Sequence, residues 1–185
     1  TLGSCYSMKK LQSSEIFFGY HDKTPFSINN DIVLAMRAPV RGNDPMAECR
    51  PVELGYFPLN KARRGNDFIK FSTTNSWCWQ QSCMMQWDPQ EPNSRIFYND
   101  LVDGKYGSYL YDLQKNKIAK SFNNPIYSIN ADGKLAVSLN FSRLGRLRPG
   151  YGYSLLSDST LNDPAPKDDG IFIVDFETGT SKLIV

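Results

Sequence analysis

One pattern of turns and strands occurs three times along the sequence. Each copy opens with an aromatic residue and a turn rich in Asn, Asp, Pro or Gly, at 26–30, 87–89 and 127–133. These residues favour tight turns because they tolerate positive φ or hold φ fixed. A run typical of a β-strand follows each turn, at 32–38, 95–99 and 134–141. In the third run, Leu135, Val137 and Leu139 alternate with smaller or polar residues, which is the period of a strand rather than a helix.

The second half of each copy is also shared. A loop of variable length leads to a third strand at 52–59, 108–113 and 171–176, and a polar turn leads to a fourth at 67–71, 118–121 and 182–185. Four antiparallel strands per repeat are typical of a β-propeller blade. We therefore predict an all-β fold of three blades, about 17–74, 75–124 and 125–185, with 1–16 as a linker or an extra strand. A β-sandwich is the alternative, and no amphipathic helix is expected.

Three blades do not close a ring, because propellers typically contain about four to eight. Unclosed blades would leave strand edges unpaired and the core exposed. We therefore expect either a longer propeller of roughly six to eight blades or a homodimer that completes the ring. The sequence begins at Thr1, so we expect a processed product or an excised piece. The compartment is left open, with a leaning towards the cytoplasm.

The composition fits a globular all-β protein. Of the 185 residues, 41% are hydrophobic and 13% aromatic, and the formal net charge of +2 is too close to neutral to indicate nucleic acid. The single histidine excludes a multi-histidine metal site within the chain, so no cofactor is expected. No apolar stretch approaches the roughly 20 residues of a membrane span. Free buried thiols are expected for the cysteines, which are Cys5, Cys49, Cys78 and Cys83.

Several segments resemble TolB-like and oligogalacturonate-lyase-like propellers. The segment 127–135 resembles their aromatic-Ser-Pro-Asp-Gly-Lys-apolar phrase, and 108–113 and 171–179 resemble a later phrase that ends in Thr-Gly. The first repeat departs most, with Asn30-Asp31 in place of Asp-Gly. The resemblance implies the propeller fold over about 17–185 but no single activity. The related lyases hold a divalent metal with several histidines, so a divalent cation here would need ligands from further blades.

Three other phrases are similar to bacterial propeller proteins of poorly defined function, some of them associated with polysaccharide biosynthesis; they are 18–26, 79–81 and 148–153. They fall in or near the connections that open at one end of each predicted blade. The loops between second and third strands open at the same end, at 39–51, 100–107 and 142–170. Because long loops on a rigid scaffold usually carry function, we expect a binding site at this end.

Candidate site residues come from these segments. His21 and Lys23 point to the same side if they lie in a strand, and His21 is either a general base or sugar contact, or a structural histidine. Trp79, Gln80 and Gln81 combine an apolar ring with amides, which suits sugar rings, although Trp79 equally fits core packing. The ends of the second strands add further candidates, which are Arg37, Asn99, Asp100 and Asn140.

A cationic and aromatic patch follows, consisting of Arg143, Arg146, Arg148, Tyr151 and Tyr153. Arginine binds carboxylates and phosphates through paired hydrogen bonds. Alternatively, these arginines pair with loop acids such as Asp158, Asp163, Asp168 and Asp169. We expect a carbohydrate-related propeller that binds an acidic or phosphorylated saccharide, or another small anionic ligand, and polysaccharide lyase or glycoside hydrolase activity is left open. A non-catalytic protein-interaction scaffold is the alternative.

Overall fold

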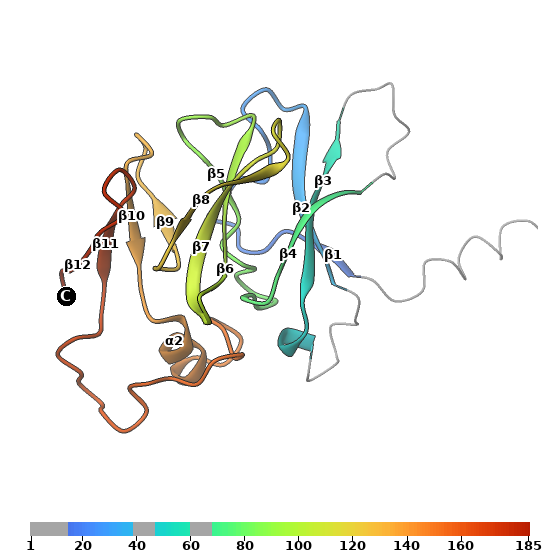
Figure 1. Ribbon diagram of the computed structural model, residues 1–185. Helices are drawn as coiled ribbons and strands as arrows, with labels where there is room; N and C mark the ends of the chain where they lie inside the picture. Colours follow the sequence, from blue (N-terminus) through green and yellow to red (C-terminus); the bar gives the residue numbers. More distant parts are fainter. Residues whose placement is uncertain (1–14, 39–46, 60–67) are drawn as a thin grey trace, which may run out of the picture.

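The computed structural model describes residues 15–38, 47–59 and 68–185, so the expectations for Cys5 and for most of 39–51 lie outside the described residues. The described residues form three four-stranded antiparallel sheets and one short α-helix, which confirms the all-β prediction (Figure 1). Strands adjacent in sequence are adjacent in every sheet. We number the sheets 1 to 3 in the order in which they occur along the chain. Sheet 2 lies between sheets 1 and 3, and the three stand side by side (Figure 1).

Sheet 1 contains β1 (Glu15–Phe17), β2 (Ile32–Ala38), β3 (Val52–Pro58) and β4 (Ile69–Thr74). Sheet 2 contains β5 (Gln86–Trp87), β6 (Arg95–Val102), β7 (Lys105–Asp112) and β8 (Lys117–Phe122). Sheet 3 contains β9 (Ser128–Ile129), β10 (Leu135–Ser138), β11 (Phe172–Asp175) and β12 (Ser181–Leu183). A 3-10 turn, η1 (Ala47–Cys49), and the helix α2 (Phe141–Leu147) lie between second and third strands. Both stand at the lower end of the molecule in Figure 1, which we call the loop end.

The connection between β6 and β7 differs from the prediction. A loop over 100–107 is wrong, because the two strands continue as a hairpin and pair residue by residue from Arg95↔Asp112 to Val102↔Lys105. Asp103 and Gly104 form the turn, with φ of 50° and 76°. Two successive positive φ values are typical of the type I′ turn that joins two-residue hairpins, and Asp-Gly is one of its preferred sequences.

The helix α2 was not expected from the sequence. The Asn140 side chain caps it by accepting a hydrogen bond from the backbone amide of Arg143. The helix packs closely on the segment that follows it, because a Cβ at Gly152 would lie 2.3 Å from the carbonyl oxygen of Phe141 and 2.4 Å from the nitrogen of Gly145. Gly152 also has a φ of +69°, which favours glycine. Seven residues are too few for a clear helical period, so tertiary packing decides this element.

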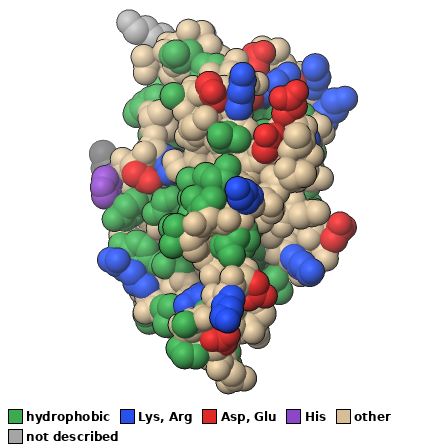
Figure 2. All heavy atoms as spheres, turned by 90° about the vertical axis from the view of Figure 1, so that its left-hand side faces the viewer, with side chains coloured by type: hydrophobic (Ala, Val, Ile, Leu, Met, Phe, Trp, Pro, Cys, Tyr) green, Lys and Arg blue, Asp and Glu red, His purple; other side chains and the backbone are tan. Residues whose placement is uncertain are grey.

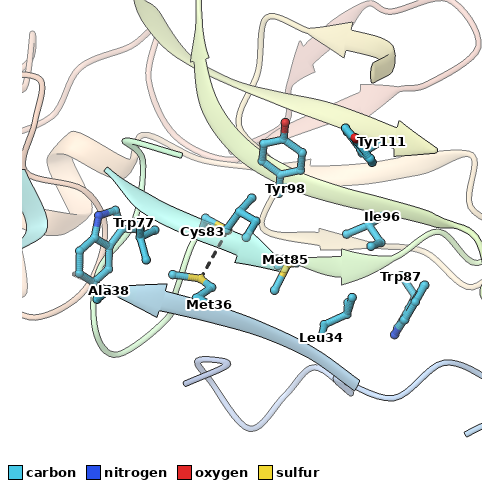
Figure 3. Close-up of a cluster of buried hydrophobic side chains, with 12 residues drawn as sticks. Leu34, Met36, Ala38, Trp77, Cys83, Met85, Trp87, Ile96, Tyr98 and Tyr111 are labelled. Atoms are coloured by element: carbon cyan, nitrogen blue, oxygen red, sulfur yellow. Dashed lines mark hydrogen bonds between the residues drawn. The ribbon is translucent and has the colours of Figure 1, made fainter. Parts of the chain in front are cut away.

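Two hydrophobic clusters hold the sheets together. The first lies between sheets 1 and 2, where Met36 of β2 meets Cys83 with a sulfur–sulfur distance of 3.7 Å (Figure 3). The second lies between sheets 2 and 3, where the rings of Phe97 and Phe176 stack with centroids 4.6 Å apart. Burial of such side chains stabilises each contact by about 1.5–3 kcal/mol per side chain. Sheet 2 is therefore covered on both faces.

Hydrogen bonds identify equivalent positions in the three sheets. In each sheet a residue just after the third strand donates a backbone hydrogen bond to the carbonyl group just before the second; the pairs are Leu59–Asp31, Leu113–Ser94 and Phe176–Lys134. The third residue after each of these carbonyl groups therefore occupies the same position in its sheet. These residues are Leu34, Phe97 and Val137. The first two are 1% and 2% exposed, because each faces the next sheet.

The face of sheet 3 that carries Val137 has no described neighbour. It presents an apolar row across the sheet, which consists of Leu135, Val137, Ile171, Ile173 and Ile184. Ile171 is 39% exposed and Ile184 51%. Figure 2 shows this side of the molecule, where hydrophobic side chains gather in a band. We call it the free face of sheet 3.

Asn99 is a polar tie between sheets 2 and 3. Its side chain is fully buried, and its Nδ2 donates to the carbonyl of Ile126 at 2.9 Å and to the hydroxyl of Tyr153 at 2.8 Å. Its Oδ1 accepts from the amide of Ile126 at 2.7 Å. Both donor hydrogens of the Asn99 amide are thus used. This explains how a polar side chain is tolerated at a buried position whose equivalent in β2 is the apolar Met36.

We predict that Asn99→Ala lowers the free energy of unfolding by about 3 kcal/mol, because it leaves several buried polar groups without partners. Urea denaturation followed by circular dichroism measures the change. Asn123→Ala, at an exposed position, is the control and should change the value by less than about 0.5 kcal/mol. Equal effects of the two variants would contradict this role of Asn99.

Candidate ligand-binding site

Residues 18–25 interrupt the innermost strand of sheet 1. β1 pairs with the end of β2, whereas Phe26 pairs with Val33 near its start, so the intervening residues leave the sheet. Residues 21–23 form a turn rather than the strand considered from the sequence. Gly19 has a φ of +130°, and a Cβ there would lie 2.6 Å from the Cβ of Ser82. A glycine is therefore required to bring this segment against the one that precedes β5.

Gln81 joins three segments that are distant in sequence. Its side chain is 3% exposed, and its Nε2 donates to the Tyr127 hydroxyl at 3.3 Å. Its Oε1 accepts from the backbone amide of Gly152, also at 3.3 Å. Gln81 lies before the first strand of sheet 2, Tyr127 before that of sheet 3, and Gly152 in the connection after α2. This amide therefore fixes the geometry of the inner edge, the edge that carries the first strands.

Aromatic rings and cations gather around Gln81. The Tyr20 ring lies 4.3 Å from that of His21 and 6.0 Å from that of Tyr151, centroid to centroid. The Arg148 guanidinium lies 4.2 Å from the centroid of Tyr151, within the range of a cation–π contact. The Lys23 ammonium lies 5.4 Å from the centroid of Tyr127. We call these residues and Gln81 the tyrosine–cation cluster.

The electrostatics of the cluster favour an anion. A hydrogen bond with Tyr151 raises the pKa of Tyr20, while partial burial and the Asp22 charge raise that of Tyr127, so both hydroxyls remain protonated donors at neutral pH. Asp22 forms an ion pair with Lys23 at 2.8 Å. Across the described ranges, no carboxylate forms an ion pair with Arg148. Arg148 is thus a cation held against a tyrosine face and open to a ligand.

The structure divides the predicted arginine patch. Arg143 forms an ion pair with Asp169 at 3.3 Å and Arg146 with Asp158 at 2.7 Å, as the loop-acid alternative requires. Arg148 does not share this pattern, although it is two residues from Arg146. Burial alone would raise the pKa of Asp158, but hydrogen bonds from Thr160 and Arg146 lower it to about 2.

The remaining predicted residues lie elsewhere. Arg37 pairs with Glu53 at 2.6 Å on sheet 1, and Asp100 accepts from the Asn75 amide at 2.8 Å. Asn140 caps α2, and Tyr153 is buried with its ring 4.4 Å from that of Phe141. Trp79 packs against Phe17 and Trp77, while Gln80 is exposed. Of the fourteen candidates, the cluster brings together five, which are His21, Lys23, Gln81, Arg148 and Tyr151.

Two cluster residues, Tyr20 and Tyr127, were not among the candidates. Asp22, which pairs with Lys23 of the cluster, was not a candidate either. Tyr20 and Asp22 flank His21 directly, and Tyr127 is the aromatic residue that opens the third repeat. That repeat position signals a residue at the inner edge, because it immediately precedes the first strand of sheet 3. The contacts of Tyr127 at the inner edge, however, depend on which other segments of the chain pack against it.

The structure also shows which of the described cysteines are buried. Cys78 and Cys83 are free and buried as predicted, whereas Cys49 is exposed, which corrects the expectation for that thiol. Burial raises the pKa of Cys78 to about 11. Within the described ranges, no three His, Cys, Asp or Glu side chains are grouped to hold a metal ion. No helix in these ranges is long and apolar enough to cross a membrane.

No protein-family model and no curated protein matches this sequence. Among solved structures, the chain is similar to the apo form of AtxE2 isopeptidase, with a TM-score of 0.50 and 12% sequence identity. The similarity covers 94% of this chain and 31% of that chain, so the chain spans about a third of the length of the protein it resembles. At this identity the likeness shows a shared arrangement of sheets and carries no activity with it.

We predict that Asp158→Asn lowers the free energy of unfolding by about 1 kcal/mol at pH 7, since the paired carboxylate is lost. The folded-state pKa of about 2 lies below the ordinary value of about 3.9, so this stabilisation is present above pH 4 and is lost as the pH falls towards 2. Urea denaturation at several pH values should show the two proteins converge near pH 2. Asp168→Asn, at an exposed position, is the control, and a constant difference across the range would contradict the prediction.

Proposed function

We propose that this chain forms three neighbouring blades of a β-propeller and binds an acidic or phosphorylated saccharide at the tyrosine–cation cluster. The Arg148 guanidinium carries this proposal, because it rests on the Tyr151 ring without a carboxylate partner among the described residues. A carboxylate or phosphate group is the ligand that satisfies a guanidinium with paired hydrogen bonds. Lys23 lies beside Tyr127, but Asp22 balances its charge at 2.8 Å, so Arg148 is the cation that carries the proposal.

The rest of the cluster suits the sugar to which such an anion is attached. Tyr20, Tyr127 and Tyr151 offer aromatic faces for the C–H faces of a sugar ring, and their hydroxyl groups are donors for ring oxygens. His21 is exposed beside Tyr20 and is available as a further contact. All three sheets contribute to this surface through segments at their inner edges. The bacterial polysaccharide-associated propellers that the sequence resembles have phrases at these same segments.

Two other functions receive less support. AtxE2 is an isopeptidase, but within the described part of this chain no serine, threonine or cysteine side chain forms a hydrogen bond with the single histidine, His21. A protein-interaction scaffold would favour an apolar patch at the loop end, whereas the apolar row that we describe runs across the free face of sheet 3. We therefore propose binding at the cluster and no catalytic step.

We predict that Arg148→Gln weakens binding of an oligogalacturonate or a sugar phosphate at least about tenfold, the expected effect of removing a charged hydrogen-bonding partner. Isothermal titration calorimetry measures the affinity. Arg146→Gln is the matched control, because the same change occurs two residues away on an arginine that is already paired with Asp158. It should alter affinity by less than about twofold.

Two results would overturn the proposed ligand class. One is the absence of binding by the unaltered chain to uronates and sugar phosphates alike. The other is an equal loss of affinity in the Arg148→Gln and Arg146→Gln variants, which would assign the effect to general surface charge. Lys23→Met should weaken binding less than Arg148→Gln does, because the Lys23 ammonium is already paired with Asp22.

We further propose that the free face of sheet 3 is covered by another four-stranded sheet of the same orientation. Its support is the equivalence of Val137 with Leu34 and Phe97, both of which are buried by the next sheet. For the 185-residue chain on its own, the available sheet is sheet 1 of a second copy, which would complete a ring of six sheets. Ring closure would also bring further residues to the inner edge.

We predict that the chain is a dimer by light scattering and that Ile173→Lys shifts it to monomer, since a lysine would be buried in the new apolar contact. Ile118→Lys is the matched control, because Ile118 is 48% exposed on the outer strand β8 and lies away from the free face. A monomer at all concentrations, or equal dissociation of both variants, would contradict dimerisation through this face.

A further inference from the structure

A cavity lies between sheets 2 and 3 near the loop end, outside the tyrosine–cation cluster. Its volume is about 550 Å³, within the range of small-molecule sites. The strands β7, β10 and β11 and the helix α2 contribute to its wall, through residues that include Tyr106, Ser138, Ser142 and Phe172. No residue of the cluster lines it.

Sheet 3 has a smaller side chain at the cavity than sheet 2 has at the equivalent position. Equivalent positions in β6 and β10 carry Tyr98 and Ser138, and their partners on the third strands are Tyr109 and Phe172. In sheet 2 the two tyrosine rings lie 5.7 Å apart and contribute to the packing against sheet 1. In sheet 3 the phenylalanine remains but its partner is a serine. Ser138 and Phe172 both line the cavity.

Two mostly buried serine residues line this cavity, and their hydroxyl groups have no partner among the described residues. Ser138 is 1% exposed and Ser142 is 9% exposed, and both belong to the cavity wall. Neither hydroxyl forms a hydrogen bond with any described residue. Neither oxygen is completely buried in the protein. Among the described residues, the completely buried side-chain oxygen without a partner is that of Ser76. Both oxygens are accessible from the cavity, so a polar ligand there would supply the partner that the protein does not.

Two charged residues, Lys105 and Asp169, line the cavity. The Asp169 carboxylate is a wall residue, but its Oδ2 already accepts from Arg143 at 3.3 Å and from Asn140 at 3.1 Å. Its other oxygen, Oδ1, has no partner among the described residues. Arg143 balances this carboxylate, and Lys105 is exposed to solvent, so the buried part of the wall carries no uncompensated charge. A neutral group that donates a hydrogen bond to Oδ1 is the ligand that this part of the wall favours.

We propose that this cavity is a binding site for a neutral sugar ring, distinct from the acidic-saccharide site. The apolar face of the sugar packs on Phe172 and takes the place that Tyr98 fills in sheet 2. Its hydroxyls both donate and accept, which matches the hydroxyls of Ser138 and Ser142 and the free Oδ1 of Asp169. No charged group of the ligand is required.

Calorimetry and saturation-transfer NMR with the methyl glycosides of glucose, galactose and mannose test this site. We expect at least one to bind, and Ser138→Ala and Ser142→Ala each to weaken it about three- to tenfold through loss of a hydrogen bond. Ser138→Leu should abolish binding by filling the cavity. Ser76→Ala is the matched control, because it removes a buried unpartnered hydroxyl that does not line the cavity. It should leave binding unchanged.

The two proposed sites fail separately in this design. Arg148→Gln should reduce affinity for uronates and not for the neutral glycosides, and Ser138→Ala should do the reverse. Absence of binding to all three glycosides would overturn the neutral-sugar site, as would an equal loss in Ser138→Ala and Ser76→Ala. Thermal unfolding by circular dichroism checks that each variant is folded. If Ser138→Leu does not fold, the two alanine variants decide the question.

Discussion

The fold depends on one constraint, which is that each sheet has two faces to bury and only the middle sheet has two described neighbours. Ile96 of sheet 2 faces sheet 1 and Phe97 faces sheet 3, so successive residues of one strand belong to different clusters. A single sheet of four strands has no apolar interior of its own, and its stability comes from these contacts with its neighbours. The same constraint leaves the free face of sheet 3 in need of a partner.

The tyrosine–cation cluster follows from this stacking. Sheets that pack face to face bring their first strands to one edge, so segments far apart in sequence meet there. Gln81 converts that proximity into fixed geometry by binding Tyr127 and Gly152, and Gly19 allows the first segment to approach. Lys23 then lies over the ring of Tyr127, and Arg148 lies over the ring of Tyr151. In the part of the chain that the structure describes, Arg148 is the cation of this cluster that no carboxylate pairs.

Sequence periodicity was sufficient for the strands but not for the pairing of charges. The turn residues and the alternation that starts at Leu135 correctly predicted three sheets, because those signals are local. The strand predicted at 134–141 was too long, because β10 ends at Ser138 and Phe141 begins α2. The Asp103-Gly104 hairpin was also encoded locally and was missed, whereas the short helix α2 depends on its packing against Gly152. Arg146 and Arg148 have similar sequence surroundings. Which of them meets a carboxylate depends on the path of a long loop, and local spacing does not determine that path.

The differences between the repeats are more informative about function than their shared pattern. Tyr98 and Ser138 occupy equivalent positions in their strands. Tyr98 fills the space between its sheet and the preceding one, whereas Ser138 lines an open cavity. A serine at such a position forfeits the dispersion and hydrophobic contacts of a ring. Its hydroxyl and that of Ser142 then lack partners in the described chain. A bound polar ring would restore both kinds of interaction at once, and a purely structural role for this serine would restore neither.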